Sequence, residues 1–528
     1  MMKTLPVAAA VAAAVVSQQT PVRPVDFSPL GVIEARLTSD RDYDNPFQDV
    51  TVTVDAVAPS GRRYRGEAFW DGGRTWRIRL PGDESGAWTW TTKSSVPSDS
   101  GLTTTGRAQH GGVRPPSRLA ASSDGTHLVG DKGQPFFWLA DTAWNGALRS
   151  TDADWREYLK RRASQRFTAI QFVTTQWRGG TRVIPRPVFR GTERIAIDPD
   201  SFASLDAKVA AVVQHGLRPA PVMLWALNPT DPGQALSEDD AIRLARYELA
   251  RWGALRPVWF LGGDGRYLAD TAPDRWKRVG RAVFGNAPDQ LATLHPSGLS
   301  WIADAFAGEA WLDFIGYQSG HGDGERDLRW LVTGPPANSA AVGKPVINLE
   351  PNYEGHPAYQ SKALHTPANV RRAAYWSMLV HAPAGVSYGN NEIWVWNLET
   401  ADAENHGNLR QIRPWREGLA TEGIDGMTRL RAFFESGPWT TLRPAPQLLA
   451  EQPGEADPRR FVAVAQTSSG DWSVAYLPMG GPIRFRVAPQ GKTTWFNPRT
   501  SERSAARAES GTTFAAPTSE DWVFEARR

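Results

Sequence analysis

The chain of 528 residues contains no cysteine. This excludes disulfides, thiolate metal ligands and a cysteine nucleophile. Beyond the N-terminus there is no apolar run long enough to cross a bilayer, so we expect no membrane span. Basic clusters are missing too: 59 Lys and Arg residues are balanced by 56 Asp and Glu residues. Without a basic run, nucleic acid is not an expected partner.

The short motifs of several enzyme classes are also absent. The sequence GGDG at 262–265 follows a predicted strand but lacks the GxGxxG spacing of a dinucleotide site. No HExxH occurs. His321, Asp323 and Glu325 alternate in a glycine-rich segment and offer metal-ligating atoms, but we predict neither a metal site nor a cofactor.

The N-terminus resembles a secretory signal. Lys3 precedes the apolar stretch LPVAAAVAAAVV, and polar residues follow from Ser17. A charged start, a short apolar stretch and small residues near the end are typical of a cleaved signal peptide. We predict a signal peptide at 1–19 and a secreted or periplasmic protein.

Two β-rich segments flank a segment of alternating strands and helices. Residues 28–112 contain short alternating stretches such as DVTVTVDAVA and GAWTWTTK between Pro- and Gly-rich turns, which predicts a β-sandwich. A proline-containing linker follows at 113–125. Residues 437–528 return to strands such as DWSVAYLP and predict a second β-sandwich domain.

The segment at 126–436 predicts an α/β fold, a (β/α)8 TIM barrel. Eight strand-like runs alternate with helix-like stretches such as 152–165, 201–216, 237–253 and 366–381. Strands alternating with helices of this length imply a parallel sheet, and eight of them imply closure. We predict the strands at 136–141, 168–173, 218–224, 257–264, 290–296, 311–318, 344–350 and 385–391.

Two of these strands end on a carboxylate. Asp264 ends the fourth strand, PVWFLGGD, and Glu350 ends the seventh, KPVINLE. The C-terminal ends of barrel strands form the active site, so both carboxylates are expected to face one cleft. A pair of carboxylates across a cleft is what glycosidic-bond hydrolysis requires.

The roles of the pair follow from the chemistry of hydrolysis. One carboxyl must stay protonated and the other must be ionised; we assign Asp264 as acid/base and Glu350 as nucleophile. Strand alternation places Asn348 one layer below Glu350, where it would orient the carboxylate. Gly262 and Gly263 are expected to leave room for a ligand beside Asp264. Glu354 is the main rival for the role of nucleophile.

Aromatic and polar residues near the other strand ends are expected to bind the sugar. The 23 tryptophans outnumber the 20 phenylalanines, and indole rings stack on sugar faces, although most of these rings are expected to fill cores. Converging amides, imidazoles and rings make a credible sugar site. The predicted substrate-binding residues are Asp141, Trp144, Gln171, Trp177, Trp225, His295, Gln318, His321, Asn348, Tyr353, Tyr388 and Asn390.

Several runs in the barrel segment resemble glycoside hydrolase family 140. They are PFFWLADTAWN (135–145), WFLGGD (259–264), KPVINLEPNYEG (344–355) and GVSYGNNEIWVW (385–396). The resemblance implies a (β/α)8 barrel with apiosidase activity on the branched pectin rhamnogalacturonan II. It also implies a catalytic Asp after the fourth strand and a catalytic Glu after the seventh, which match Asp264 and Glu350. The tail, with WFNPRT (495–500), is similar to a β-domain of the collagen-binding type that often follows such barrels.

We therefore expect a glycoside hydrolase, retaining in mechanism, that acts on a plant or microbial polysaccharide. Two alternatives stay open at this point. A carbohydrate-binding protein on a degenerate barrel would bind oligosaccharides without releasing reducing sugar. A polysaccharide lyase would release unsaturated products that absorb in the near ultraviolet.

Overall fold

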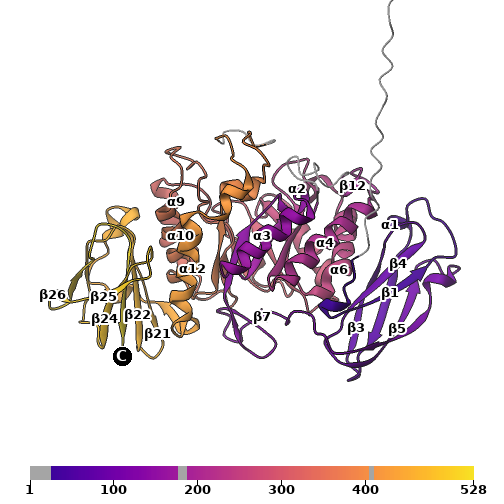
Figure 1. Cartoon of the computed structure of the whole chain (residues 1–528), viewed down its shortest axis with the longest axis horizontal. Coiled ribbons are helices and arrows are strands. Elements are labelled where there is room, and N and C mark those ends of the chain that lie inside the picture. The colour runs from indigo at the N-terminus through magenta and orange to yellow at the C-terminus, as the bar shows by residue number, and fades with distance from the viewer. Residues whose placement is uncertain (1–24, 176–186, 404–409) are drawn as a thin grey trace, which may run out of the picture.

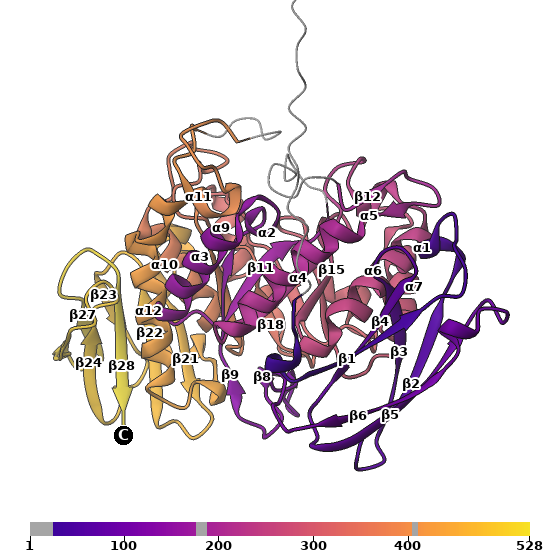
Figure 2. The ribbon, with the colours of Figure 1, turned by 45° about the vertical axis from the view of Figure 1, so that its right-hand side comes forward.

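A central barrel lies between two β-rich parts. The computed structural model describes residues 25–175, 187–403 and 410–528. Figures 1 and 2 show the N-terminal strands at one end of the molecule, the barrel with its helices in the middle and the C-terminal strands at the other end. The predicted signal peptide lies outside the described residues. Within them, no helix is long and apolar enough to cross a membrane.

The predicted eight parallel strands are confirmed. They form one sheet in the order β16-β15-β14-β11-β10-β19-β18-β17, and β10 pairs with both β11 and β19, so the first strand joins the last. The main-chain N–H of Asp313, just before β17, donates to the carbonyl of Ala292 in β16 and draws the remaining two edges together. The sheet is therefore a nearly closed barrel. Its strands are β10 (Trp138–Thr142), β11 (Ala169–Val173), β14 (Arg218–Trp225), β15 (Val258–Gly265), β16 (Leu291–Pro296), β17 (Ile315–Tyr317), β18 (Val346–Asn348) and β19 (Gly385–Gly389).

Helices cover the outside of the barrel, and side-chain caps begin several of them. The side chains of Thr151 and Ser237 accept from main-chain N–H groups of the first turns that follow them, and Thr366 forms a capping box with Asn369. The four predicted helices are α3 (Asp152–Ser164), α4 (Pro199–Gln214), α6 (Glu238–Trp252) and α10 (Pro367–Leu379). The others in this part are α2 (Gly146–Arg149), α5 (Pro232–Ala235), α7 (Ala272–Phe284), α8 (Ala303–Phe306), α9 (Glu325–Val332), α11 (Asn391–Val395) and α12 (Glu422–Glu435).

The N-terminal strands form one six-stranded antiparallel sheet in the order β1-β4-β3-β2-β5-β6, where a sandwich was expected. β3 pairs with β2 along its length but with β4 only through Phe69 and Trp70, so the sheet splays between β3 and β4. Val52, Trp76 and Trp88 belong to its core. The elements are β1 (Val32–Thr38), α1 (Pro46–Asp49), β2 (Val52–Val57), β3 (Arg63–Trp70), β4 (Thr75–Pro81), β5 (Gly86–Ser94) and β6 (Thr105–His110).

A buried ion-pair cluster joins this sheet to the barrel helices. Arg79 of β4 binds the carboxylate of Asp206 in α4 with two bonds of 3.1 and 2.8 Å. Arg251 of α6 binds the same carboxylate at 2.8 and 2.9 Å and also reaches Asp71. Burial alone would raise the pKa of Asp206, but the two guanidinium groups lower it to about 2.

The C-terminal part has two sheets over one core that includes Phe485, Trp495 and Phe524. Arg371 of α10 binds Asp521 with two bonds of 2.8 Å and ties this part to the barrel. The strands are β20 (Leu442–Pro444), β21 (Ala463–Thr467), β22 (Trp472–Leu477), β23 (Pro482–Arg484), β24 (Lys492–Phe496), β25 (Arg503–Ala505), β26 (Ala508–Ser510), β27 (Thr513–Ala515) and β28 (Trp522–Arg527). Short strands in the connections are β7 (Ala120–Ala121), β8 (Leu128–Val129), β9 (Pro135–Phe136), β12 (Phe189–Arg190) and β13 (Ala196–Ile197).

Candidate active site

The two candidate carboxylates stand at the C-terminal ends of their strands. Asp264 is the penultimate residue of β15, and Glu350 follows the last residue of β18 by two positions. Asp264 has a φ of +51°, a left-handed conformation that costs a non-glycine residue about 1–2 kcal/mol. Such strained residues gather at functional sites, where the surrounding structure holds them in place.

The glycines beside Asp264 make room for the protein's own rings and not for a ligand, which corrects our prediction. A Cβ on Gly262 would lie 2.4 Å from the hydroxyl of Tyr267, and one on Gly263 would lie 2.4 Å from the Trp225 ring. Tyr267 is fully buried, and burial together with the nearby charge of Asp264 raises its pKa. Sequence reasoning missed Tyr267, since nothing but its position three residues after Asp264 marks it.

His295, at the end of β16, joins Asp264 to Glu350. The main-chain N–H of Asp264 donates to Nδ1 of His295 at 3.3 Å. On the other side of the ring, Nε2 lies 3.2 Å from Oε2 of Glu350, an ion-pair distance whose angle falls short of a hydrogen bond. Because Nδ1 accepts a hydrogen, a neutral ring carries its proton on Nε2 and turns it toward the carboxylate.

His321 approaches the same carboxylate in the same way. Its Nδ1 accepts from the main-chain N–H of Tyr353 at 3.4 Å, and its Nε2 lies 3.0 Å from Oε1 of Glu350. Gln318 donates a second hydrogen bond to Oε1, also at 3.0 Å. In both histidines a main-chain amide therefore fixes the tautomer that points N–H at Glu350.

The surroundings of Glu350 favour its ionised form. The residue is 7% exposed, and this burial alone would raise the pKa of the carboxyl. Contacts with His295 and His321 outweigh burial and hold the pKa of Glu350 well below its ordinary value. Oε1 accepts hydrogen bonds from Gln318 and His321, whereas within the described ranges Oε2 lies against Nε2 of His295 without a geometrically complete hydrogen bond.

Aromatic rings wall this part of the barrel mouth. Trp144 lies edge-on to Trp225 at 5.3 Å and to His295 at 5.2 Å between ring centroids. Its indole N–H donates to the hydroxyl of Tyr353 at 3.1 Å. The negative charge of Glu350 adds to burial in raising the pKa of Tyr353. Thus the structure gathers six of the predicted binding residues around Glu350: Trp144, Trp225, His295, Gln318, His321 and Tyr353.

Other predicted residues serve the packing of the barrel. Asp141 faces α3, where it pairs with Arg162 and accepts from Tyr158. Asn348 does not orient Glu350, contrary to the prediction: its amide donates to Ser319 at 2.9 Å and to Ser377 of α10 at 3.0 Å. The alternation that we extended to Glu350 ends at Asn348, because β18 stops there.

Three further predicted residues have identifiable structural partners, and one lies outside the described residues. Gln171 lies inside the barrel and donates to Thr142 and to the carbonyl of Leu349, so it supports the chain just before Glu350. Asn390 caps α11 through the N–H of Glu392. Tyr388 donates its hydroxyl hydrogen to Glu354 at 2.5 Å. Trp177 lies in the part of the chain that is not described.

The rival carboxylate Glu354 is engaged elsewhere. Besides Tyr388, it accepts from the hydroxyl of Thr421 at 2.6 Å and from the main-chain N–H of Gly423 at 3.1 Å. Thr421 and Gly423 begin α12, so Glu354 anchors the start of that helix. Over the described ranges, no group of three or more His, Asp or Glu side chains is arranged to hold a metal ion.

Comparison with known proteins gives two family matches and a set of solved structures with a similar fold. Residues 122–441 match the family described as apiosidase-like, catalytic domain, and residues 29–95 match a domain of unknown function, DUF5060. No curated protein sequence matches the chain. The barrel and its site, with the family match, define a glycoside hydrolase. Because the first match covers more than half of the chain, the chain belongs to the apiosidase-like catalytic-domain family.

Solved structures share the fold at low sequence identity. One is a glycoside hydrolase family 5 protein from Bacteroides vulgatus, 20% identical, with a TM-score of 0.65 over 77% of this chain and 92% of that one. Another glycoside hydrolase is 22% identical, with a TM-score of 0.63 over 78% of this chain and 96% of that one. A third structure, also from Bacteroides vulgatus, covers 94% of this chain and 99% of its own at 15% identity and a TM-score of 0.68.

Proposed function

We propose that this glycoside hydrolase is retaining, with Glu350 as nucleophile and Asp264 as acid/base. The observation that carries the proposal is the environment of Glu350, whose pKa is held low by two imidazole rings. An ionised carboxylate suits a nucleophile and cannot serve as the acid. Asp264 supports the second role because its main chain contacts the far side of the His295 ring.

The proposed reaction has two steps. Oε2 of Glu350, the oxygen with fewer partners, attacks the anomeric carbon and forms a C–O bond. At the same time the glycosidic C–O bond breaks and Asp264 gives its proton to the leaving oxygen. In the second step Asp264 takes a proton from water, the hydroxide oxygen bonds to the anomeric carbon, and Glu350 leaves as carboxylate.

The N–H groups around Glu350 have opposite effects on the two steps. Hydrogen bonds from His321 and Gln318 lower the basicity of the carboxylate, which makes it a weaker nucleophile and a better leaving group. Since burial alone would raise the pKa, the donors also keep the carboxyl ionised before substrate arrives. We infer that release from the glycosyl-enzyme is the step they assist.

The substrate that we propose is a plant or microbial polysaccharide outside the cytoplasm. Family membership and the resemblance to apiosidases support apiose as the sugar released. The aromatic wall of Trp144 and Trp225 supports binding of a sugar ring near Glu350. The signal-like N-terminus supports a secreted or periplasmic location.

A screen of aryl glycosides and polysaccharides, with rhamnogalacturonan II among them, tests the proposal. We expect release of a reducing sugar whose anomeric configuration, followed by proton NMR in the first minutes, equals that of the substrate. Inverted product would contradict the retaining mechanism. Products that absorb in the near ultraviolet would indicate a lyase and contradict hydrolysis.

A further inference from the structure

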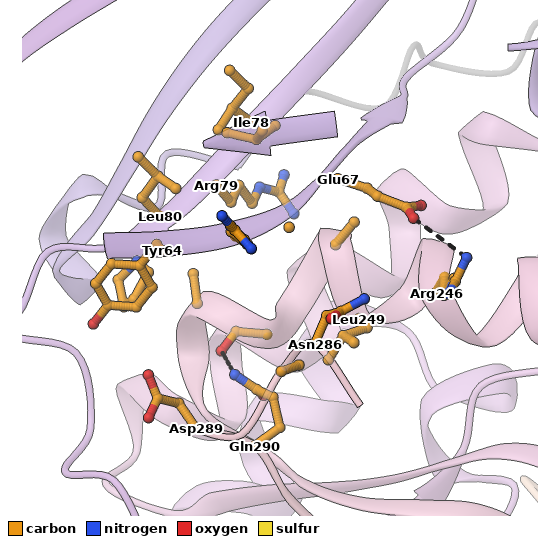
Figure 3. Close-up of a pocket in the computed structure, with 18 of the residues that line it drawn as sticks. Tyr64, Glu67, Ile78, Arg79, Leu80, Arg246, Leu249, Asn286, Asp289 and Gln290 are labelled. Carbon is orange, nitrogen blue, oxygen red and sulfur yellow. Dashed lines mark hydrogen bonds and ion pairs between the residues drawn. The ribbon is translucent and has the colours of Figure 1, made fainter. Parts of the chain in front are cut away.

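A cavity of about 650 Å³ lies between the N-terminal sheet and the barrel helices α6 and α7. Figure 3 shows β-strand residues such as Ile78 and Leu80 on one side of it and helix residues such as Leu249 on the other. We call it the module cleft, defined by Tyr64, Glu67, Ile78, Leu80, Arg246, Leu249, Ala250, Asn286 and Gln290. Its volume lies within the range of small-molecule sites.

The module cleft is remote from the candidate active site. Gln290, which lines it, immediately precedes β16, whereas His295 stands near the other end of the same strand. Five residues of a parallel strand span roughly 16 Å. The cleft therefore lies toward the end of the barrel opposite to Glu350, and a ligand there would not occupy the catalytic centre.

The splay of the N-terminal sheet opens the cleft. From Arg63 to Ala68, β3 pairs with β2 on one side. On its other side, pairing with β4 is confined to Phe69 and Trp70, so the edge of β3 before these residues faces the cleft. In an antiparallel strand, alternate residues direct their N–H and C=O groups to the same edge. The cleft wall thus presents main-chain donors and acceptors as well as side chains.

At one edge of the cleft, a carboxylate from the sheet lies beside a guanidinium group from α6. Oε1 of Glu67 lies 3.6 Å from Nη1 of Arg246, longer than a hydrogen bond. Nε and Nη2 of Arg246 both donate to the carbonyl of Ala282, which fixes the group and leaves Nη1 toward Glu67. Figure 3 shows this pair at the edge of the cavity. Burial raises the pKa of Glu67, an effect that Arg246 partly offsets.

This pairing selects for a particular ligand chemistry. Of the other charged residues in the lining, Arg65 pairs with Asp55, Arg79 with Asp206 and Arg256 with Asp83. At the Glu67–Arg246 pair, an anion would be repelled by Glu67 and a cation by Arg246. A hydroxyl group can donate to the carboxylate and its oxygen can accept from the guanidinium. On the helix side, the partly exposed Leu249 and Ala250 offer apolar surface to the C–H groups of a sugar ring. We propose that the module cleft binds a neutral oligosaccharide and holds the polysaccharide to the enzyme away from the catalytic site. That the bound oligosaccharide is part of the enzyme's polysaccharide substrate rests on the proposed function.

Binding to the full chain carrying Glu350→Gln, which prevents turnover, tests the site. The probes are neutral gluco-, manno-, xylo- and galacto-oligosaccharides, followed by titration calorimetry. Hydrogen bonds to charged groups contribute about 1.5–3 kcal/mol, so Glu67→Gln should weaken cleft binding about tenfold or more. Ala250→Trp, which fills the cleft, should remove that site altogether. Glu238→Gln, which breaks the pair between Glu238 of α6 and Arg278 of α7, is the matched control and should leave cleft binding unchanged.

Hydrogen exchange locates the ligand independently. An oligosaccharide in the cleft should slow exchange of main-chain amides in 63–67, and Ala250→Trp should abolish that protection while circular dichroism shows an unchanged fold. The inference is overturned if no probe protects 63–67, or if Glu67→Gln and Ala250→Trp leave every isotherm unchanged. Hydrolysis of a small aryl glycoside by the chain with wild-type Glu350 is measured separately. If the chain with wild-type Glu350 hydrolysed no aryl glycoside, the proposed function would be contradicted. The proposal of cleft binding is tested separately, by the calorimetric isotherms.

Discussion

The main-chain N–H of Asp264 donates to Nδ1 of His295, 3.3 Å away, and so ties the strained end of β15 to an imidazole of the neighbouring strand. The same ring presents Nε2 to Glu350 at 3.2 Å. One side chain therefore fixes the backbone of the proposed acid/base and stabilises the charge of the proposed nucleophile. Changes at His295 are expected to affect both residues.

Removing a donor from Glu350 should move the acidic limb of the pH–rate profile. The pKa of Glu350 is lowered by its histidine neighbours, so His321→Phe should raise it and narrow the range in which the carboxylate is ionised. A hydrogen bond to a charged group contributes about 1.5–3 kcal/mol, which corresponds to a shift of about one to two pH units. The measurement is kcat/KM against pH, which reports the free enzyme.

His321→Gln is the control for this shift. The amide of glutamine can still donate to Oε1, so we expect most of the acidic limb to return to its wild-type position. If both variants shifted the profile equally, the donor would not be the cause. An unshifted profile in His321→Phe would show that Glu350 is not the group whose ionisation limits the rate at low pH.

The two neighbouring glutamates should behave differently when each becomes glutamine. Glu350→Gln should lower kcat by several orders of magnitude, because an amide cannot form the glycosyl-enzyme. Glu354→Gln should keep kcat within a few-fold but lower Tm, since Glu354 anchors α12 through Thr421 and Gly423. Loss of turnover in Glu354→Gln at an unchanged Tm would reverse the assignment.

Strand periodicity predicted the barrel because each strand is buried and bounded by turns and helices, which are local properties of the chain. The same local patterns predicted that Asp264 and Glu350 lie at the C-terminal ends of their strands. The direction of single side chains was less predictable. Asp141 and Tyr388 also lie near strand ends, yet Arg162 and Glu354 hold them on the helix side.

Contacts between distant segments account for what the sequence could not predict. His295 and His321 direct N–H groups at Glu350 because the main-chain amides of Asp264 and Tyr353 select their tautomers. No spacing of residues in the sequence predicts these amide–imidazole contacts. The glycines near Asp264 were predicted to admit a ligand, but rings from other segments fill that space. The sequence shows that these residues are glycines, but it does not show which side chains lie next to them.

Gly263→Ala should disturb the aromatic wall. The added methyl group would lie 2.4 Å from the Trp225 ring, and overpacking of this kind costs about 1–3 kcal/mol. We expect a lower Tm and a higher KM, because Trp225 would have to move from its present place beside Trp144. Gly308→Ala is the matched control: its added methyl group would meet nothing within 4 Å, so both values should stay close to wild type.

The junction of the N-terminal sheet and the barrel should weaken at acid pH. Arg79 and Arg251 lower the pKa of Asp206 to about 2, so its ionised form stabilises the fold at pH values above the pKa of the unfolded chain, about 4. This contribution, about 2 kcal/mol, is lost as pH falls from about 4 through about 2. Urea unfolding at several pH values should show wild type approaching Asp206→Asn as the pH falls.

A surface ion pair between two loops of the N-terminal part gives the comparison. Asp42→Asn breaks the exposed pair with Arg74, and exposed pairs contribute little, so its unfolding curve should follow wild type throughout. If the difference between wild type and Asp206→Asn were independent of pH, ionisation of Asp206 would not stabilise this junction.

The proposed chemistry is tested most directly by trapping the glycosyl-enzyme. A 2-deoxy-2-fluoro glycoside of the released sugar, with a good leaving group, slows the second step, so the labelled protein can be digested and its peptides identified by mass spectrometry. We predict one sugar per chain attached to Glu350, and no label in Glu350→Gln. A label on Glu354 or another residue, or rapid turnover with no covalent adduct at any time, would contradict the assignment of Glu350 as nucleophile.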